Sequence, residues 1–484
     1  MKKVKRISVI YSLIGLFLLL IIFIPTNLGY NTVLIIATIC FMFMFYSWFK
    51  VANILNYYTI FLASCFVFYY GQYVVYFITG ENITRWMSIT SNFPENTMNE
   101  TAMFILRCVL ILHIAVLLFF NSGKAKRVDC IRREIGSDKL YKETKHLKAH
   151  RLASGIFFCI TYIPAMLIGV FKAALTSTLN YSDLLGYNVH IFGNPVDQIL
   201  RLLASFAIAA FIYVIISNRG SRLLKIYTIL ILLYIGVYYL SGSRLRVTLF
   251  ILIAVLIYND LFNKISKMQA FMMIPIAIIT LLVIGGIGAT RSSFSTYGSM
   301  QGIINGIFQN FKENNIFISL LNEFGMTAVV ITNVLVHCPN PIGFLWGKSY
   351  VFSLLYILPG FIWDEEAMLQ VIDTDTAFHG YINKYSGVGS SFIAEAYYNF
   401  GYGSYIIVFI YGLFLAVIMN RLLEGNYKKD VIKSSMVYYV LALVLFSVRS
   451  DLYNLLRESL YAFIIIKILY MISLRFVGGA KLSR

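Results

Sequence analysis

Residues 387–420 read GVGSSFIAEAYYNFGYGSYIIVFIYGLFLAVIMN, in which a polar and aromatic stretch runs directly into an apolar one. The apolar part, residues 403–420, carries no charged side chain. A membrane-spanning helix needs roughly 20 such residues, because at ~1.5 Å of rise per residue they cross a hydrocarbon core of ~30 Å. Residues 403–420 are therefore predicted to span a membrane, and runs of this kind decide the fold of the whole chain.

Apolar runs of this length recur along the sequence. Of its 484 residues, 59% are hydrophobic and only 13% are charged, which exceeds the apolar content that a water-soluble core of this size needs. We therefore predict an all-α polytopic membrane protein with about twelve transmembrane helices. The predicted spans are residues 7–24, 30–49, 54–78, 101–121, 152–176, 198–217, 223–241, 246–260, 269–289, 403–420, 432–449 and 457–474.

The distribution of lysine and arginine predicts the orientation of the chain. Residues 121–151 hold ten Lys and Arg against four Asp and Glu, and with twelve spans the other basic segments fall on the same side. Cytoplasmic loops are enriched in Lys and Arg, so both termini are predicted in the cytoplasm. The formal net charge of +18 follows mostly from this topology. No nucleic-acid partner is predicted, because no basic patch is interleaved with aromatic residues in a soluble domain.

A long segment separates the ninth and tenth predicted spans. Residues 290–402 hold four Lys and Arg against eight Asp and Glu, the opposite bias to the cytoplasmic loops. We expect one large extracytoplasmic loop of helical and re-entrant segments, such as residues 350–363, which can lie at membrane depth only inside protein or beside a wet cavity. The chain then divides into residues 1–289 with nine spans, the loop 290–402, and residues 403–484 with three spans.

The polar part of the opening stretch is predicted to be helical from Ser390 or Ser391. Ser391, Glu395 and Asn399 would then recur at i, i+4 and i+8 on one helix face, with Tyr398 beside them. Such a stripe has to face water, protein or a ligand. Tyrosine suits a sugar ring, although it suits a membrane-interface belt equally well.

Five arginines are predicted near the outer membrane face, where positive charge is normally depleted. Arginine makes planar, bidentate contacts with phosphate, so the group indicates an anionic ligand such as a lipid-linked pyrophosphate. Each could instead snorkel to the headgroups or pair with an acidic neighbour, as Arg449 could with Asp451. The five are Arg244, Arg246, Arg291, Arg449 and Arg457.

Three residues of the predicted outer loop are candidates for acid–base chemistry: Glu395, Glu323 and His379. Both glutamates occur in apolar helical sequence, where burial favours a protonated carboxyl and suits it to proton transfer. An interhelical hydrogen bond explains either of them equally well. Asp373-Thr-Asp375 has a spacing that could chelate a divalent cation, but as a lone tripeptide on the outer side it leads us to predict no metal site. No cofactor is predicted.

Four motifs between residues 240 and 420 form a combined pattern. They are Gly242-Ser-Arg, Asn322-Glu-Phe-Gly, Leu358-Pro-Gly and Gly387-x-Gly-Ser-Ser-Phe-x-Ala-Glu-Ala-Tyr-x-Asn-Phe-Gly. Together with the many spans, this pattern resembles the Wzy-type repeat-unit polymerases of O-antigen and capsule synthesis. The first half of the chain matches only as a generic bundle of helices.

The resemblance implies a GT-C-like membrane glycosyltransferase of the bacterial cytoplasmic membrane that works on the outer side without a nucleotide sugar or a required metal. It would transfer a growing glycan from undecaprenyl pyrophosphate onto a new lipid-linked repeat unit. The five arginines would bind the pyrophosphate, and Glu395, or else Glu323 or His379, would position or deprotonate the acceptor hydroxyl. Ser391, Tyr398 and Asn399 would bind the acceptor sugar. A chain-length-determining co-polymerase is often a further partner in such systems.

Two other functions stay open at this point. An O-antigen ligase-like enzyme would use the same lipid-pyrophosphate donor but a different acceptor. A lipid-linked oligosaccharide flippase or secondary transporter would carry mid-membrane charges or paired broken helices, whereas this chain concentrates its polar residues in the predicted outer loop.

Overall fold

The computed structural model describes most of the chain. Within the described residues every regular element is helical, which confirms the predicted all-α class. The described residues are 15, 29–52, 56–80, 93–121, 145–175, 192, 194–241, 244–262, 265, 268–269, 272, 316–358, 365–378, 389–422 and 430–479.

The chain folds into two compact units. Unit 1 comprises Met1–Ala125, Phe317–Asn420 and Val444–Arg457, and unit 2 comprises Lys126–Ile316, Arg421–Leu443 and Glu458–Arg484. The helices α23 (Val431–Phe446) and α24 (Tyr453–Gly479) therefore contribute residues to both units.

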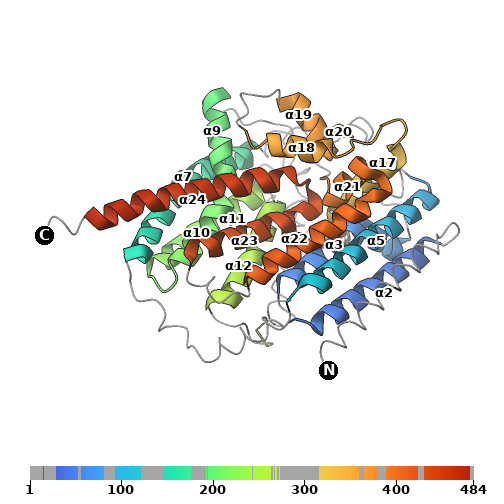
Figure 1. Cartoon of the computed structure of the whole chain (residues 1–484), viewed down its shortest axis with the longest axis horizontal. Helices are drawn as coiled ribbons and strands as arrows, with labels where there is room; N and C mark the ends of the chain where they lie inside the picture. The colour runs from blue at the N-terminus through green and yellow to red at the C-terminus, as the bar shows by residue number, and fades with distance from the viewer. Residues whose placement is uncertain are drawn as a thin grey trace, which may run out of the picture. The chain divides into compact units, whose positions relative to one another are not determined.

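Unit 1 is built on α2 (Tyr30–Phe49), α3 (Tyr57–Thr79) and α5 (Glu95–Phe119), which lie side by side (Figure 1). The Asn56 side chain caps α3 by accepting a hydrogen bond from Thr59 N at 3.1 Å. His113 in the buried helix α5 joins its neighbours, because its ring nitrogens contact Ser47 Oγ at 2.6 Å and Tyr58 Oη at 3.0 Å. These contacts give apolar helices a fixed register where hydrophobicity alone would allow sliding.

A further helix pair packs against α3 in unit 1. The pair consists of α16 (Ile316–Phe324) and α17 (Thr327–His337), which α3, α5 and α21 contact. Gly71 of α3 and Gly325 at the α16–α17 junction face one another so closely that a Cβ on either would overlap the other backbone. Glycine is therefore required at this crossing, as in other close helix contacts within membranes.

The remaining part of unit 1 carries the polar sequence of the predicted outer loop. Its helices are α18 (Lys348–Leu355), α19 (Glu365–Ile372), α20 (Thr374–Ala377), α21 (Phe392–Phe400), the 3₁₀ turn η4 (Gly401–Gly403), α22 (Ser404–Leu422) and the 3₁₀ turn η6 (Ser447–Arg449).

Unit 2 is organised around the long helix α7 (Lys145–Leu175), against which α9 (Asn194–Ser205), α10 (Ala207–Ser217) and α11 (Leu223–Leu240) pack. Helices α9 and α10 meet at a bend of 43°. The unit continues with α12 (Arg244–Ile257) and the π-helical turn η1 (Tyr258–Phe262). Ser154 of α7 accepts from Ser217 Oγ at 2.7 Å, so a polar contact fixes α7 to α10 among apolar side chains.

Eight described helices are long and apolar enough to cross a membrane, or nine if the bent α9–α10 pair is one span. Seven of these eight coincide with predicted spans, and the bent pair coincides with the predicted span 198–217. The predicted spans 7–24 and 269–289 lie almost wholly outside the described residues, so a total of twelve stays a prediction. Helix α12 has only 14 residues.

Leu320–His337 is the candidate span that the sequence analysis did not predict, because it lies within the segment 290–402. The apolar run at Phe392–Leu422 also begins earlier than the predicted 403, since α21, η4 and α22 follow one another without a break. In both places polar residues occur within a candidate span, because their hydrogen-bonding groups are satisfied inside the protein. A hydropathy profile cannot show this.

Candidate active site

The predicted polar stripe belongs to α21 and its N-cap, and this helix is buried along nearly its whole length. The helix begins where the sequence indicated, with Ser391 as its N-cap residue and Ser391 Oγ accepting from Ala394 N at 3.0 Å. Ser391, Glu395 and Asn399 are all fully buried. The stripe therefore faces protein in the described part of unit 1. Neighbouring segments form hydrogen bonds with the side chains of Glu395 and Asn399.

Glu395 joins three segments of unit 1. One carboxylate oxygen accepts from Ser349 Oγ of α18 at 2.9 Å, and the other accepts from Leu452 N, just before α24, at 2.8 Å. Both donors are neutral, and no ion pair to Glu395 occurs among the described residues. Since buried carboxylates are normally paired with a cation, this arrangement is unusual and typical of functional sites.

Asn399 holds the segment before α18 against α21. Its side-chain nitrogen donates to Ser349 Oγ at 2.7 Å and to the Glu395 carbonyl at 2.8 Å, while its oxygen accepts from Gly347 N at 3.1 Å. Ser349 Oγ therefore accepts from Asn399 and donates to Glu395. The amide, the hydroxyl and the carboxylate form one chain of hydrogen bonds, in which Asn399 orients the serine that contacts Glu395.

Asp451 is a second buried carboxylate, in the turn between η6 and α24. It accepts from Thr374 N and Thr374 Oγ1, both at 2.9 Å, and from Ser390 Oγ at 2.6 Å. Burial raises the pKa of Asp451 well above its usual range, and the charges of Glu395 and Asp373 raise it further. The described contacts of Asp451 do not include the Arg449 pairing that the sequence offered as an alternative.

Asp373 completes a group of three acids, which we call the carboxylate cluster: Asp373, Glu395 and Asp451. The Asp373 side chain caps α20, accepting from Asp375 N and Thr376 Oγ1, both at 3.1 Å. Burial also raises the pKa of Asp373. The first Asp of the Asp-x-Asp motif is thus the N-cap residue of α20. The described residues contain no group of three or more His, Cys, Asp or Glu placed to hold a metal ion.

Tyr350 of α18 lies within electrostatic range of both Glu395 and Asp451. Its hydroxyl oxygen is buried and has no hydrogen-bond partner among the residues that the structure describes. The ring stacks on Phe400 with centroids 6.2 Å apart. Burial raises the pKa of Tyr350, with a smaller contribution from the two carboxylates, so the hydroxyl is a neutral donor. A buried donor without an acceptor among the described residues is rare in proteins, so Tyr350 is a candidate to contact a polar ligand group.

Two of the five predicted arginines belong to this part of the chain. The Arg449 side chain lies against Gly389, where an added Cβ would come within 2.7 Å of Arg449 Cγ and 2.8 Å of Nε. The Arg457 guanidinium lies 4.3 Å from the centroid of the Tyr356 ring. Among the residues that the structure describes, Arg449 forms no ion pair.

The other predicted site residues are placed elsewhere or lie outside the description. Glu323 is half-buried on α16. Tyr398 is buried against Phe378 with ring centroids 5.0 Å apart. Arg244 begins α12 in unit 2, where Arg246 pairs with Glu458 at 3.5 Å. His379 and Arg291 lie outside the described residues.

Sequence reasoning missed three residues of the site: Ser349, Tyr350 as a donor beside the acids, and Asp451 as part of the carboxylate cluster. Asp451 is 56 residues from Glu395 in the sequence, and only folding brings the two charges together. The one available signal was a pair of charged residues, Arg449 and Asp451, between two apolar runs.

These features define a multi-pass helical membrane protein with a buried acid site formed by segments far apart in the chain. The family model for the O-antigen polysaccharide polymerase Wzy matches residues 7–478, and the chain therefore belongs to this family. Neither a curated protein nor a solved structure matches the chain. The resemblance found in the sequence is thus confirmed, and the protein is a glycosyltransferase-type polymerase that acts on lipid-linked oligosaccharide repeat units in a membrane.

Proposed function

We propose that the protein polymerises undecaprenyl-pyrophosphate-linked repeat units on the outer side of the bacterial cytoplasmic membrane, without a metal ion. Both termini would lie in the cytoplasm, in a GT-C-like topology of about twelve spans. A co-polymerase that sets chain length is a proposed partner. The observation that supports this function best is the pair Glu395 and Asp451, two buried carboxylates within electrostatic range that accept only from neutral donors among the described residues.

The proposed reaction is a displacement at the anomeric carbon of the donor sugar. The acceptor hydroxyl oxygen forms the new bond to this carbon, the carbon–oxygen bond to the diphosphate breaks, and undecaprenyl pyrophosphate leaves with the electron pair. The acceptor proton passes to Glu395, which Ser349 and Leu452 N hold in place. Glu323 and His379 stay as alternative proton acceptors.

Asp451, the second carboxylate, can assist the transfer reaction because repulsion between like charges keeps the acids of the carboxylate cluster from all being ionised at once. When several acids share a buried site, some keep a proton while another is ionised. The raised pKa of Asp451 thus suits it to donate a hydrogen bond to the acceptor sugar while Glu395 takes the proton. Tyr350 offers a further unpartnered donor for a sugar hydroxyl.

Charge on the departing diphosphate grows in the transition state, so a fixed cation nearby lowers the barrier. Arg449 and Arg457 are the proposed cations of unit 1. The other three predicted arginines are also proposed to bind lipid-linked pyrophosphate, separately from Arg449 and Arg457. They are Arg244, Arg246 and Arg291. Ser391, Asn399 and Tyr398 are proposed to act on the acceptor sugar by shaping α21, since their own polar groups are largely buried.

A product ladder tests the proposed function. Purified protein in detergent, given only a lipid-linked repeat unit, is expected to form products of increasing length. A single transfer product would favour an O-antigen ligase-like enzyme. Movement of the lipid-linked oligosaccharide across vesicles without new glycosidic bonds would favour a flippase. Arg449→Gln should shorten the ladder strongly, whereas the exposed Lys433→Gln, which pairs only with Asp430 in the described chain, should not.

A further inference from the structure

Trp346 lies in the turn before α18 with a left-handed backbone, at a φ of +51°. Among the residues that the structure describes, it is the one residue other than glycine with a positive φ. This backbone conformation disfavours a bulky side chain, because the Cβ crowds the neighbouring peptide groups, and glycine or asparagine is usual there. The backbone therefore does not explain a tryptophan at this position.

Hydrogen bonds to the end of α21 hold this turn in place. Leu345 N donates to the Tyr398 carbonyl and Trp346 N donates to the Asn399 carbonyl, both at 3.0 Å. Gly347 N donates to Asn399 Oδ1 at 3.1 Å. These bonds satisfy two carbonyl groups in the last turn of α21, which explains the shape of the turn but not the side chain at its tip.

Packing does not explain the side chain either. Trp346 is 74% exposed, and its ring lies against Phe344 in an edge-to-face contact with centroids 5.9 Å apart. A tryptophan normally contributes to stability by burying its large ring. A strained backbone that carries an exposed ring is therefore best explained by a contact with a molecule outside the fold.

Tyr402 is a second exposed ring in the same aromatic group, with 65% of the residue exposed. Phe344 contacts Tyr397 with ring centroids 6.0 Å apart, and Tyr397 contacts Tyr402 at 5.7 Å. Phe344 also packs against Gly401, where an added Cβ would come within 2.8 Å of its ring. Two exposed rings thus stand on a packed aromatic base at the C-terminal end of α21.

This end of α21 is close to the proposed catalytic acid. Asn399, whose carbonyl accepts from Trp346 N, follows Glu395 by four residues, which is about 6 Å along a helix axis. Its side chain also donates to Ser349 Oγ, which contacts Glu395. Sugar units that follow the one at Glu395 are therefore within reach of the exposed rings.

The surroundings of Trp346 favour a polar partner over lipid. In the described segment between Val336 and Val351 it is the only exposed large apolar side chain, and its exposed neighbours include Asn340 and Lys348. Surfaces that insert into a membrane carry several apolar side chains on one face. A sugar ring fits better, because it has a flat apolar face and polar hydroxyls at its edge.

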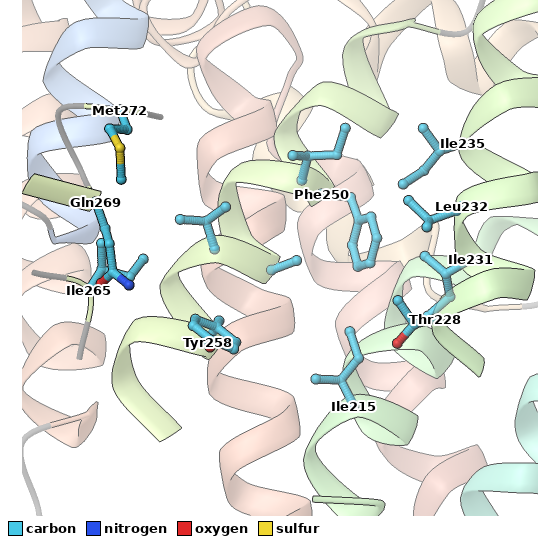
Figure 2. A pocket seen from close by; sticks show the side chains of 13 residues that line it. Ile215, Thr228, Ile231, Leu232, Ile235, Phe250, Tyr258, Ile265, Gln269 and Met272 are labelled. Carbon is cyan, nitrogen blue, oxygen red and sulfur yellow. The ribbon is translucent and has the colours of Figure 1, made fainter. Parts of the chain in front are cut away.

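An apolar cavity of about 660 Å³ in unit 2 suits a glycan poorly (Figure 2). Only three of its thirteen lining residues carry a polar side-chain group, and Figure 2 shows Ile231, Leu232, Ile235 and Phe250 around the space. Sugar hydroxyls buried there would lose hydrogen bonds to water without gaining others. A glycan is therefore expected at an exposed surface instead.

We propose that Trp346 and Tyr402 stack on sugar rings of the glycan beyond the two sugars that are being joined. The assignment rests on the proposed function and extends it, because it adds a glycan-recognition surface to the acid site. An aromatic face holds a sugar ring while the hydroxyls stay hydrated.

Equilibrium dialysis tests the proposal with the purified full-length protein in detergent. The probe is the labelled oligosaccharide repeat unit from which mild acid has removed the lipid. Trp346→Asn is expected to weaken binding roughly fivefold to tenfold, whereas Trp346→Phe, which keeps an aromatic face, should stay within about threefold of the wild type. Phe476→Asn is the matched control, because Phe476 on α24 is 71% exposed, and it should leave the affinity unchanged. Equal affinities of the W346N and F476N variants would overturn the proposal.

Stability should change in the opposite direction to binding. Asparagine tolerates the left-handed backbone better than tryptophan, so Trp346→Asn is expected to raise the Tm by roughly 1–3 °C while it weakens binding. A variant that lowers both the Tm and the affinity would assign Trp346 a structural role and overturn the proposal.

Fluorescence in vesicles of brominated phosphatidylcholine tests the membrane alternative. The difference between the emission of the wild type and that of Trp346→Phe isolates Trp346. The brominated chains are expected to leave this emission unquenched, and the lipid-free oligosaccharide is expected to change it. Quenching by the lipid without a response to the oligosaccharide would make Trp346 a membrane anchor and overturn the proposal.

The dialysis needs no turnover, so it separates this proposal from the proposed function. If Trp346→Asn binds the oligosaccharide as the wild type does, the glycan surface fails whatever the ladder shows. If the wild-type protein forms no ladder but Trp346→Asn still weakens binding, the glycan surface stands and the polymerase assignment fails.

Discussion

Ser349 Oγ donates to the Glu395 carboxylate at 2.9 Å and accepts from Asn399 Nδ2 at 2.7 Å. One hydroxyl thus connects the acid of α21 to the amide one turn further along the same helix. Because Ser349 and both of its partners are buried, water does not replace the hydroxyl when it is removed. Ser349 therefore positions the carboxylate to which we assign the proton transfer.

Ser349→Ala should lower the rate of polymerisation more than it raises the KM for the lipid-linked repeat unit. Loss of the donor leaves one Glu395 oxygen and one Asn399 hydrogen unpartnered, at about 1–3 kcal/mol of folding free energy. The pH profile of the rate should move as well, since the carboxylate loses a hydrogen bond to its ionised form.

Ser353→Ala is the matched control for this variant, because Ser353 is buried on the same helix but donates to the Ser349 carbonyl at 2.7 Å. It should lose stability without a change in the pH profile. A profile that moves equally in both variants would assign Ser349 a purely structural role.

Glu395→Gln should reduce the rate of ladder formation by roughly 10²–10⁴, the usual contribution of a general base. Glutamine keeps the size of the side chain and can still accept from Ser349 or from Leu452 N, so the variant should fold. Band intensities over time, with thermal unfolding as the control for folding, measure the effect. A rate within threefold of the wild type would move the catalytic assignment to Glu323 or His379, for which the corresponding Gln variants are the next test.

The sequence predicted the α21 part of the site because that part depends on local spacing. Ser391 is an N-cap residue by type, and Glu395 and Asn399 follow at intervals of four, so their shared face could be foreseen. Asp451 could not be foreseen, since its partners Thr374 and Ser390 are 77 and 61 residues away. Its buried state is a product of tertiary folding alone.

Membrane spans were predicted where apolar residues are continuous and missed where they are not. Leu320–His337 contains Asn322, Glu323 and Gly325, which interrupt the apolar run. The structure explains one of these interruptions, because Gly325 allows close contact with Gly71. Hydropathy treats such a residue as a loop signal, although here it makes a helix contact.

Asp451→Asn should change how stability depends on pH. An acid whose pKa is raised by folding stabilises the native state fully below its unfolded pKa of about 3.9. This contribution is lost as the pH rises toward the folded pKa, which for Asp451 lies well above the usual range. The wild-type Tm is therefore expected to fall relative to the Tm of the variant as the pH rises from about 5 to 8.

Scanning fluorimetry in detergent across this range measures the difference in Tm. Asp430→Asn serves as the control, because Asp430 forms an exposed pair with Lys433 at 3.6 Å. A constant difference in Tm between wild type and the Asp451 variant over the whole range would contradict the raised pKa.

Gly389→Ala should impair polymerisation by displacing Arg449. Gly389 has a φ of +83°, which favours glycine by about 1 kcal/mol, and its added Cβ would come within 2.8 Å of Arg449 Nε. Gly220→Ala is a matched control, because Gly220 has a φ of +75° but nothing within 4 Å of the added Cβ. Both variants should lose similar backbone stability, whereas only Gly389→Ala should lose most of its rate, with the KM raised less than the rate is lowered. Thermal unfolding of the two variants measures the backbone strain, and ladder kinetics measure the effect of displacing Arg449. Equal polymerisation rates in both variants would remove Arg449 from the proposed mechanism.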